Sequence, residues 1–300
     1  MMGLLRKYLF LAGCLACLTD SGLARDNRIA FERITSSNGL LQNDIIATVQ
    51  DSTGFLWFAT HNGLCRYDGY DFVYFKNRYD SSNTIGSNVL LSMACDHEGH
   101  IWIGTKDGLD CYDPRFDRFI NFRDSLEASG ERMPNYRVAA IYVGNDGIVW
   151  FSVNNRLYAY RGDRQFDFNV IRNKKGRPQP SYIFDICEAP FGQLYVATNR
   201  GVYLYNPKTG ASNLFFLPSS VQDGASDKLN VLYADISGGQ LLAGGDAGLF
   251  RLGRDGTYSG EIDYEGTPVR RVSAVCRDSR RRLWIGTEDN GLYLLEKNSL

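Results

Sequence analysis

Short stretches of alternating apolar and polar residues, separated by turns rich in Gly, Asn and Asp, recur along this chain. The segment IWIGTKDGLDCYD, residues 101–113, predicts a strand, a tight turn and a second strand. The segment LWFATHNGLCRYD, residues 56–68, shows the same pattern 45 residues earlier. Because apolar residues at every second position with turn residues between them are typical of β-hairpins, the pattern predicts a repeated β structure.

The repeat occurs six times, and each copy has one large apolar anchor residue at the same place in its second strand. The anchors are Trp57, Trp102, Trp150, Tyr195, Leu242 and Trp284. Their separations are 45, 48, 45, 47 and 42 residues, and a Gly stands three positions before the first five of them. A constant period of this length indicates a repeat architecture.

Each copy predicts four short antiparallel strands. In the first copy they are the segments IIATVQD, LWFAT, GLCRYD and FVYFK. Four strands in about 45 residues form one blade of a β-propeller, so we expect an all-β fold built from four-stranded antiparallel blades. The anchor is expected to fill the layer between neighbouring blades, where its burial contributes about 1.5–3 kcal/mol.

The motif D-x-x-G-x-[IL]-W-[IF]-[GA]-T-x-x-G resembles the two-component regulator propeller repeat, with its fullest matches at residues 51–72, 96–119 and 278–295. The third to fifth copies are degenerate, with Val153 in place of Thr and Leu242 in place of Trp. The first residue of D-x-x-G is expected to cap its turn through its own side chain. The resemblance implies the first propeller of a hybrid two-component histidine kinase, truncated here, which senses oligosaccharides in the periplasm.

Two ways of closing the propeller follow from the sequence. Residues 28–34 predict an extra strand, and the sixth copy ends after its third strand. The extra strand could complete a six-bladed ring. The resemblance instead implies an incomplete seven-bladed ring, and we favour this interpretation because the blades of the family are shaped for seven.

The first 24 residues have the order of a secretory signal peptide. Arg6 and Lys7 precede an apolar run, and Gly22-Leu23-Ala24 supplies small residues for cleavage. We therefore expect a signal peptide over residues 1–24, a propeller over residues 25–300 and a periplasmic location. Lipidation at Cys14 is a minor alternative, because Leu11-Ala12-Gly13-Cys14 resembles a lipobox.

Composition and motifs limit the partners and the kinds of site that this chain is expected to have. The net charge is −1 with no basic stripe, which argues against a nucleic-acid partner. No catalytic or phosphate-binding motif occurs, and we expect no cofactor and no metal. His97 and His100 are expected to be exposed in a turn, and the acidic pairs Asp110–Asp113 and Glu288–Asp289 to lie at solvated loop tips.

Propeller geometry predicts where a ligand would bind. The turns between second and third strands and the loops that lead into the first strands open on the same edge, where amides, charges and tyrosines suit sugar hydroxyls. The turns supply the candidates His61, Asn62, Lys106, Asp107, Asn154, Asn199, Arg200, Asp246, Glu288 and Asp289. The loops supply the candidates Asn43, Asn88, Tyr136, Arg137, Tyr182 and Arg271.

The favoured function is a non-catalytic sensor propeller that contacts an oligosaccharide and other extracytoplasmic modules of a sensor kinase, with no membrane span in this chain. Two alternatives remain open. One is a stand-alone periplasmic binding protein. The other is a propeller enzyme, either a lyase or a quinone-type oxidoreductase, because fold does not determine function.

Overall fold

The computed structural model describes residues 29, 31–128, 135–154, 156–162, 166–170, 182–218, 228–235 and 239–295. The chain forms two compact units, residues 1–34 and residues 35–300, and the description below concerns the second unit. The predicted signal peptide and the alternative lipidation site at Cys14 lie outside the described residues.

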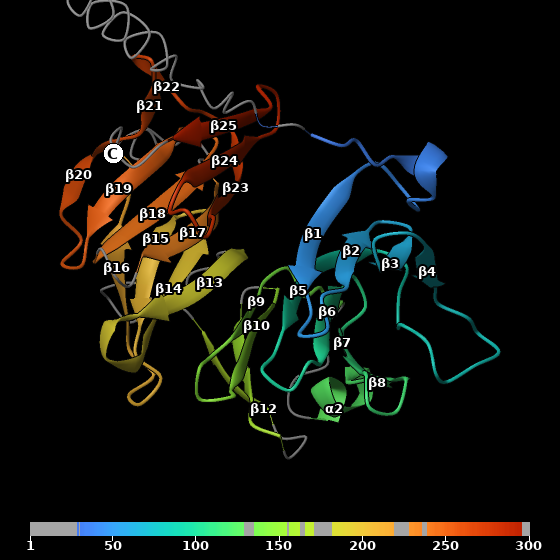
Figure 1. Ribbon diagram of the computed structural model, residues 1–300. Coiled ribbons are helices and arrows are strands. Elements are labelled where there is room, and N and C mark those ends of the chain that lie inside the picture. Colours follow the sequence, from blue (N-terminus) through green and yellow to red (C-terminus); the bar gives the residue numbers. More distant parts are fainter. Residues whose placement is uncertain are drawn as a thin grey trace, which may run out of the picture. The chain divides into compact units, whose positions relative to one another are not determined.

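The second unit is a β-propeller with six blades, one for each copy of the repeat (Figure 1). The first blade contains β1 (Ile45–Gln50), β2 (Leu56–Thr60), β3 (Gly63–Tyr67) and β4 (Phe72–Phe75). The second contains β5 (Leu90–Cys95), β6 (Ile101–Thr105), β7 (Leu109–Asp113) and β8 (Arg118–Asn121). The third contains β9 (Ile141–Val143), β10 (Val149–Val153), β11 (Arg156–Tyr160) and β12 (Phe166–Val170).

The remaining blades follow the same order. The fourth contains β13 (Ile183–Ala189), β14 (Gln193–Thr198), β15 (Gly201–Tyr205) and β16 (Ser212–Phe216). The fifth contains β17 (Leu229–Asp235), β18 (Gln240–Gly245), β19 (Leu249–Gly253) and β20 (Tyr258–Glu261). The sixth is described with three strands, β23 (Val272–Arg277), β24 (Leu283–Thr287) and β25 (Leu292–Leu295). All pairings within the blades are antiparallel, and each strand pairs with the next in the sequence.

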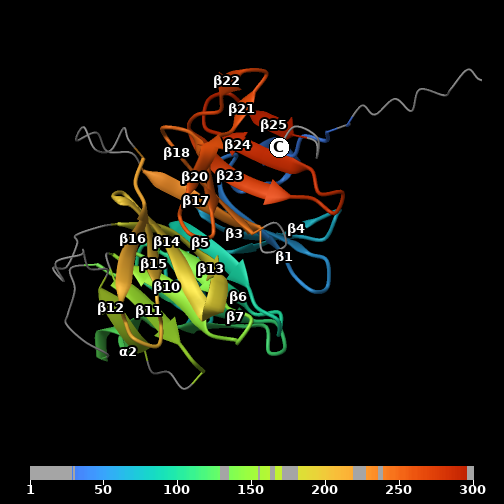
Figure 2. The same cartoon turned by 90° about the vertical axis from the view of Figure 1, so that its left-hand side faces the viewer.

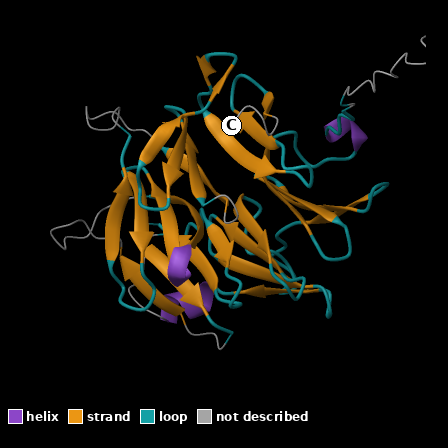
Figure 3. Cartoon of the chain, turned by 60° about the vertical axis from the view of Figure 1, so that its left-hand side comes forward, coloured by secondary structure: helices purple, strands orange, loops and turns teal. Residues whose placement is uncertain are grey.

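A few short elements interrupt the blades and were not predicted from the sequence (Figure 3). They are the 3-10 helices η1 (Ser36–Asn38) and η2 (Pro190–Gly192), the helix α2 (Arg123–Ala128) and a small hairpin of β21 (Asp263–Tyr264) and β22 (Thr267–Pro268). The predicted strand at residues 28–34 is wrong for its described part, since Ile29 and residues 31–34 lie in no strand. A strand needs backbone pairing with a neighbour, and none of these described residues joins a ladder.

Five of the six anchors lie in the clusters between successive blades, which confirms their predicted role. The Trp57 ring lies 5.1 Å from that of Tyr112 in the second blade, and the Trp102 ring lies 5.2 Å from that of Tyr160 in the third. One buried cluster of hydrophobic side chains lies between each pair of successive blades. Trp284 of the sixth blade is only partly buried.

The innermost strands join the blades in sequence order (Figure 2). Contacts link β1 to β5, β5 to β9, β9 to β13, β13 to β17 and β17 to β23. In the described part of the chain, no comparable set of contacts joins β23 to β1. Each blade is therefore held mainly by the blades before and after it.

Candidate functional site

The turn between the first and second strands is organised by one carboxylate. Asp51 accepts hydrogen bonds from the backbone N–H groups of Thr53 at 2.9 Å and Phe55 at 3.1 Å. The same carboxylate accepts a hydrogen bond from the indole Nε1–H of the anchor Trp57 at 2.8 Å. Burial opposes ionisation, but these hydrogen bonds outweigh it and lower the pKa of Asp51. The predicted capping role of this Asp is confirmed.

The same contact recurs in the second and sixth blades. Asp96 accepts from the Trp102 indole at 2.9 Å, and Asp278 accepts from the Trp284 indole at 3.0 Å. We name the edge that carries these turns, and the turns between third and fourth strands, the turn edge.

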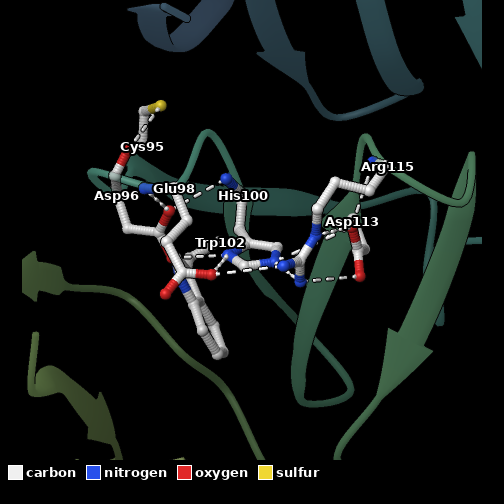
Figure 4. A network of polar contacts seen from close by, with 7 residues as sticks. All are labelled: Cys95, Asp96, Glu98, His100, Trp102, Asp113 and Arg115. Carbon is white, nitrogen blue, oxygen red and sulfur yellow. Dashed lines mark hydrogen bonds and ion pairs between the residues drawn. The ribbon is translucent and has the colours of Figure 1, made fainter.

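In the second blade the Asp–Trp contact is part of a wider network (Figure 4). His100 Nδ1 lies 2.9 Å from Asp96 Oδ2, and its Nε2 lies 3.0 Å from an Arg115 nitrogen that also approaches Asp113. The prediction of an exposed imidazole is wrong for His100, whose side chain is only 14% exposed, because Asp96 and Arg115 hold both ring nitrogens in place.

The opposite edge, which we name the loop edge, carries the turns between second and third strands and the loops into the first strands. Four of these turns are closed by a Thr hydroxyl that donates to a Gly carbonyl three or four residues later. The pairs are Thr60–Gly63, Thr105–Gly108, Thr198–Gly201 and Thr287–Gly291, at 2.8–3.0 Å. Gly63 has a φ of +115°, and an added Cβ would lie 2.8 Å from the Phe75 carbonyl oxygen, so this position requires glycine.

Within a blade, the loop and the turn of this edge are joined by backbone hydrogen bonds. Asn154 N–H donates to Arg137 O at 3.0 Å, Asn199 N–H to Tyr182 O at 3.3 Å, and Glu288 N–H to Arg271 O at 3.0 Å. The second and fifth blades have the equivalent bonds from Lys106 and Asp246. The two sets of candidate ligand residues therefore lie beside each other in the second, third, fourth and sixth blades.

Several candidate side chains serve the local structure of this edge. Arg271 forms ion pairs with Glu288 at 2.6 Å and Asp289 at 3.3 Å, all three about half exposed. Tyr136 is 3% exposed and packs in the core. The side chains of five candidate amides bond to nearby loops; these amides are Asn43, Asn62, Asn88, Asn154 and Asn199.

The other candidates have surfaces that a ligand could reach. The exposed ones are His61, Lys106, Arg137, Tyr182 and Arg200. Asp107 and Asp246 are half-buried in their turns.

A cavity of about 270 Å³ opens at the loop edge of the second blade beside Asp107. Asp110 lines it and accepts hydrogen bonds from Asn121 Nδ2 and the Gly86 N–H, both at 2.7 Å. Burial raises the pKa of Asp110 to about 6, although these hydrogen bonds oppose the shift. The prediction of solvated loop tips is wrong for Asp110 and Asp113, because both lie inside β7 and are 2% exposed.

Two further cavities lie at the turn edge, and none of the predicted ligand residues lines them. One, of about 450 Å³, is lined by Gly144 and Trp150 of the third blade together with residues of the fourth. The other, of about 270 Å³, is lined by Ala189 and Tyr195 of the fourth blade together with residues of the fifth. Glu188 lines both cavities, so they are neighbours.

The feature of the sequence that indicates these cavities is the loss of the motif Asp in the third and fourth copies. Six positions before the anchor, Gly144 and Ala189 replace the Asp that fills this space in the first, second and sixth copies. The missing carboxylate leaves space beside the anchor in the third and fourth copies.

The described residues contain no group of three or more His, Cys, Asp or Glu side chains placed to hold a metal ion. Nor does any helix in the described ranges have the length and apolar character needed to cross a membrane.

The comparisons with known proteins agree with the repeat. The two component regulator propeller family matches residues 39–62, 84–107 and 266–289. These segments contain the D-x-x-G turn or the second-strand motif of the first, second and sixth copies. A comparison with curated protein sequences finds no match.

Solved structures share the fold. The extracellular domain of the proposed hybrid two component system BT3049 from B. thetaiotaomicron is 23% identical, with a TM-score of 0.71 over 89% of this chain and 35% of that chain. The corresponding domain of BT4673 from the same organism is 24% identical, with a TM-score of 0.66 over 85% of this chain and 32% of that chain. This chain thus spans about a third of the length of either domain.

An enzyme has the same architecture. A catalytically inactive virginiamycin B lyase from Staphylococcus aureus, solved with quinupristin, is 14% identical, with a TM-score of 0.65 over 84% of this chain and 81% of that chain. At such identities these likenesses show the fold alone. The family match rests instead on the motif, and it shows that three segments of this chain are similar to the two component regulator propeller repeat.

Proposed function

We propose that this chain is a ligand-recognition propeller in the extracytoplasmic sensor region of a hybrid two-component system, and that it responds to oligosaccharides. The observation that carries the proposal is the match of three segments to the two component regulator propeller family. The similar fold of two extracellular domains of hybrid two component systems supports it. In this proposal the segment is not catalytic, residues 1–24 direct it to the periplasm, and its other partners are further extracytoplasmic modules.

The loop edge is the proposed oligosaccharide site. Lys106 and Arg200 offer charged donors, and Asp107 offers an acceptor beside the cavity that Asp110 lines. The exposed ring of Tyr182 offers an apolar face. Sugars present both hydroxyl groups and apolar C–H faces, so a mixture of charged groups and an aromatic ring suits them.

The test is calorimetric titration of the purified chain with xylohexaose, cellohexaose, mannohexaose and maltohexaose. We expect one of them to bind, and Asp107→Asn or Arg200→Ala to weaken it at least tenfold. The matched control is Asp71→Asn, which changes an exposed carboxylate at the turn edge of the first blade. Absence of binding by all four sugars would contradict the proposal.

A second measurement separates the sensor from the stand-alone alternative. An antiserum against residues 25–300 is used to blot periplasmic and membrane fractions of the native cells. The sensor proposal requires a membrane-bound band several times larger than 33.8 kDa. A soluble band slightly smaller than 33.8 kDa would support a stand-alone binding protein instead.

A further inference from the structure

The third blade retains the anchor Trp of the repeat but lacks the carboxylate that binds it. In the first, second and sixth blades, Asp accepts a hydrogen bond from the anchor indole at 2.8–3.0 Å. Trp150 is 6% exposed, and no described residue accepts a hydrogen bond from its indole N–H. The indole nitrogen is not among the described buried atoms that lack a partner, so it remains open to solvent, and the side chain that carries it lines the 450 Å³ cavity.

The missing carboxylate is only partly replaced. Asp146 takes over the capping of the turn and accepts a hydrogen bond from the Ile148 N–H at 3.1 Å. Its carboxylate occupies space beside Gly144, since a Cβ added to Gly144 would lie 2.5 Å from Asp146 Oδ1. The backbone N–H group of the turn therefore has an acceptor, whereas the Trp150 indole N–H has none among the described residues.

The fourth blade extends the site. Ala189 stands at the Asp position and Tyr195 at the anchor position, and both line the adjoining 270 Å³ cavity. Glu188 borders both cavities and accepts hydrogen bonds from Tyr142 Oη–H at 3.3 Å and Asn145 Nδ2–H at 3.0 Å. These two bonds hold a carboxylate between the cavities with acceptor capacity to spare.

The charges of the larger cavity identify the chemical class of its ligand. Glu188 and Asp146 oppose an anion, whereas Arg161 and Lys208 oppose a cation. A neutral ligand with several hydroxyl groups is repelled by neither kind of charge. Each of its hydroxyl groups can both donate and accept a hydrogen bond. Such a ligand can supply the acceptor for the Trp150 indole and a donor to Glu188.

We propose that these two cavities form a second glycan site, at which a sugar hydroxyl takes the place of the Asp carboxylate of the other blades. For the class of ligand this inference rests on the proposed function. Its location is inferred from observations at the turn edge alone, whereas the predicted ligand residues lie at the loop edge. Since the cavities share Glu188, the ligand spans more than one sugar ring.

The test uses the indole N–H signals of the full chain labelled with ¹⁵N-tryptophan. The sequence contains four Trp residues, so four signals are expected, and Trp150→Phe assigns the one of interest. The same four hexasaccharides are added. We expect a bound sugar to shift the Trp150 signal, because its N–H gains an acceptor, and to leave the three Asp-bonded signals nearly unchanged.

A variant that restores the motif provides the sharpest control. Gly144→Asp with Asp146→Thr recreates the turn of the first copy, in which Asp51 precedes Thr53 by two positions. Gly144 has no positive φ, and the neighbour closest to the new side chain is removed by the second change. We expect this variant to move the Trp150 signal toward the other three without ligand, to keep its thermal midpoint, and to weaken sugar binding at this site at least tenfold.

Glu188→Gln gives a second variant, which keeps the side-chain volume and should weaken binding at least fivefold. A sugar that binds and is weakened by Asp107→Asn, but never shifts the Trp150 signal, would overturn this inference and leave the proposed function intact. A sugar that shifts Trp150 and binds the motif-restored variant equally well would also overturn it. If no hexasaccharide binds, both proposals are wrong.

Discussion

The carboxylate of Asp185 accepts a hydrogen bond from the backbone N–H of Leu232 at 2.7 Å, although the two residues belong to successive blades. The other carboxylate oxygen accepts from the Ile186 N–H at 2.8 Å. Asp185 follows a β-bulge in β13 that recurs at the same place in β1, β5, β17 and β23. In β5 the equivalent Ser92 donates to Val138 O of the next blade at 3.1 Å. The bulge thus aims a polar side chain at the neighbouring blade.

Burial makes the Asp185 contact sensitive to pH. It raises the pKa of Asp185 from 3.8 to about 7, against the two hydrogen bonds that favour the charged form. Because the folded state holds this proton between about pH 4 and 7 and the unfolded state does not, the free energy of unfolding should fall as pH rises through that range, by up to about 1.4 kcal/mol per unit. Urea unfolding between pH 5 and 8 measures it. Asp185→Asn should flatten the slope, and an unchanged slope would contradict the assignment.

The inter-blade anchors should differ in their contribution to stability. Trp57 is 1% exposed and packs against the second blade, so Trp57→Ala should lower the free energy of unfolding by about 3–5 kcal/mol. Trp284 is partly buried, and Trp284→Ala should cost clearly less. Denaturant unfolding of both variants tests this order, and equal losses would be inconsistent with the burial described for the sixth blade.

The capping carboxylate should matter more than its exposed neighbours. Asp51→Ala removes the acceptor for the Trp57 indole and for two backbone N–H groups, so we expect a loss of about 1–3 kcal/mol. Since the pKa of Asp51 is lowered by folding, its contribution should be present above about pH 4 and lost below it. Asp71→Ala, in an exposed turn of the same blade, should change stability by less than about 0.5 kcal/mol. Thermal unfolding compares the two.

The Arg271 ion pairs should contribute little to stability. All three side chains are about half exposed, so Arg271→Ala should lower the free energy of unfolding much less than Asp51→Ala does, and less again at high salt. A double-mutant cycle with Glu288→Gln measures the coupling. A coupling energy as large as the loss in Asp51→Ala would contradict this prediction and would mean that the pair is better shielded from solvent than its exposure indicates.

The regular features of the fold were predictable because they repeat. Two-residue alternation and Gly-rich turns located the strands, and the spacing of Trp57, Trp102 and Trp150 gave the length of one blade. The capping role of Asp51 followed from turn chemistry alone.

The irregular features depend on tertiary contacts that no local pattern encodes. Asp110 was expected at a loop tip, but it lies buried inside β7, where the Gly86 N–H and the Asn121 side chain donate hydrogen bonds to its carboxylate. His100 was expected to be exposed, yet Arg115, fifteen residues later, returns to cover its ring. The larger turn-edge cavity arises because Gly144 has no side chain. The sequence indicates such a cavity only if the role of the Asp at this position in the other copies is known.

Because each blade is held mainly by its sequence neighbours, a change in one copy of the motif need not be matched in the others. Repetition supplies the same Asp–Trp contact in several blades. The loss of one carboxylate leaves a cavity in place of one contact, while the remaining copies keep the fold intact. A binding site that arises in this way needs no new side chain. The indole N–H that bonds to the protein's own carboxylate in the other copies becomes available to a ligand.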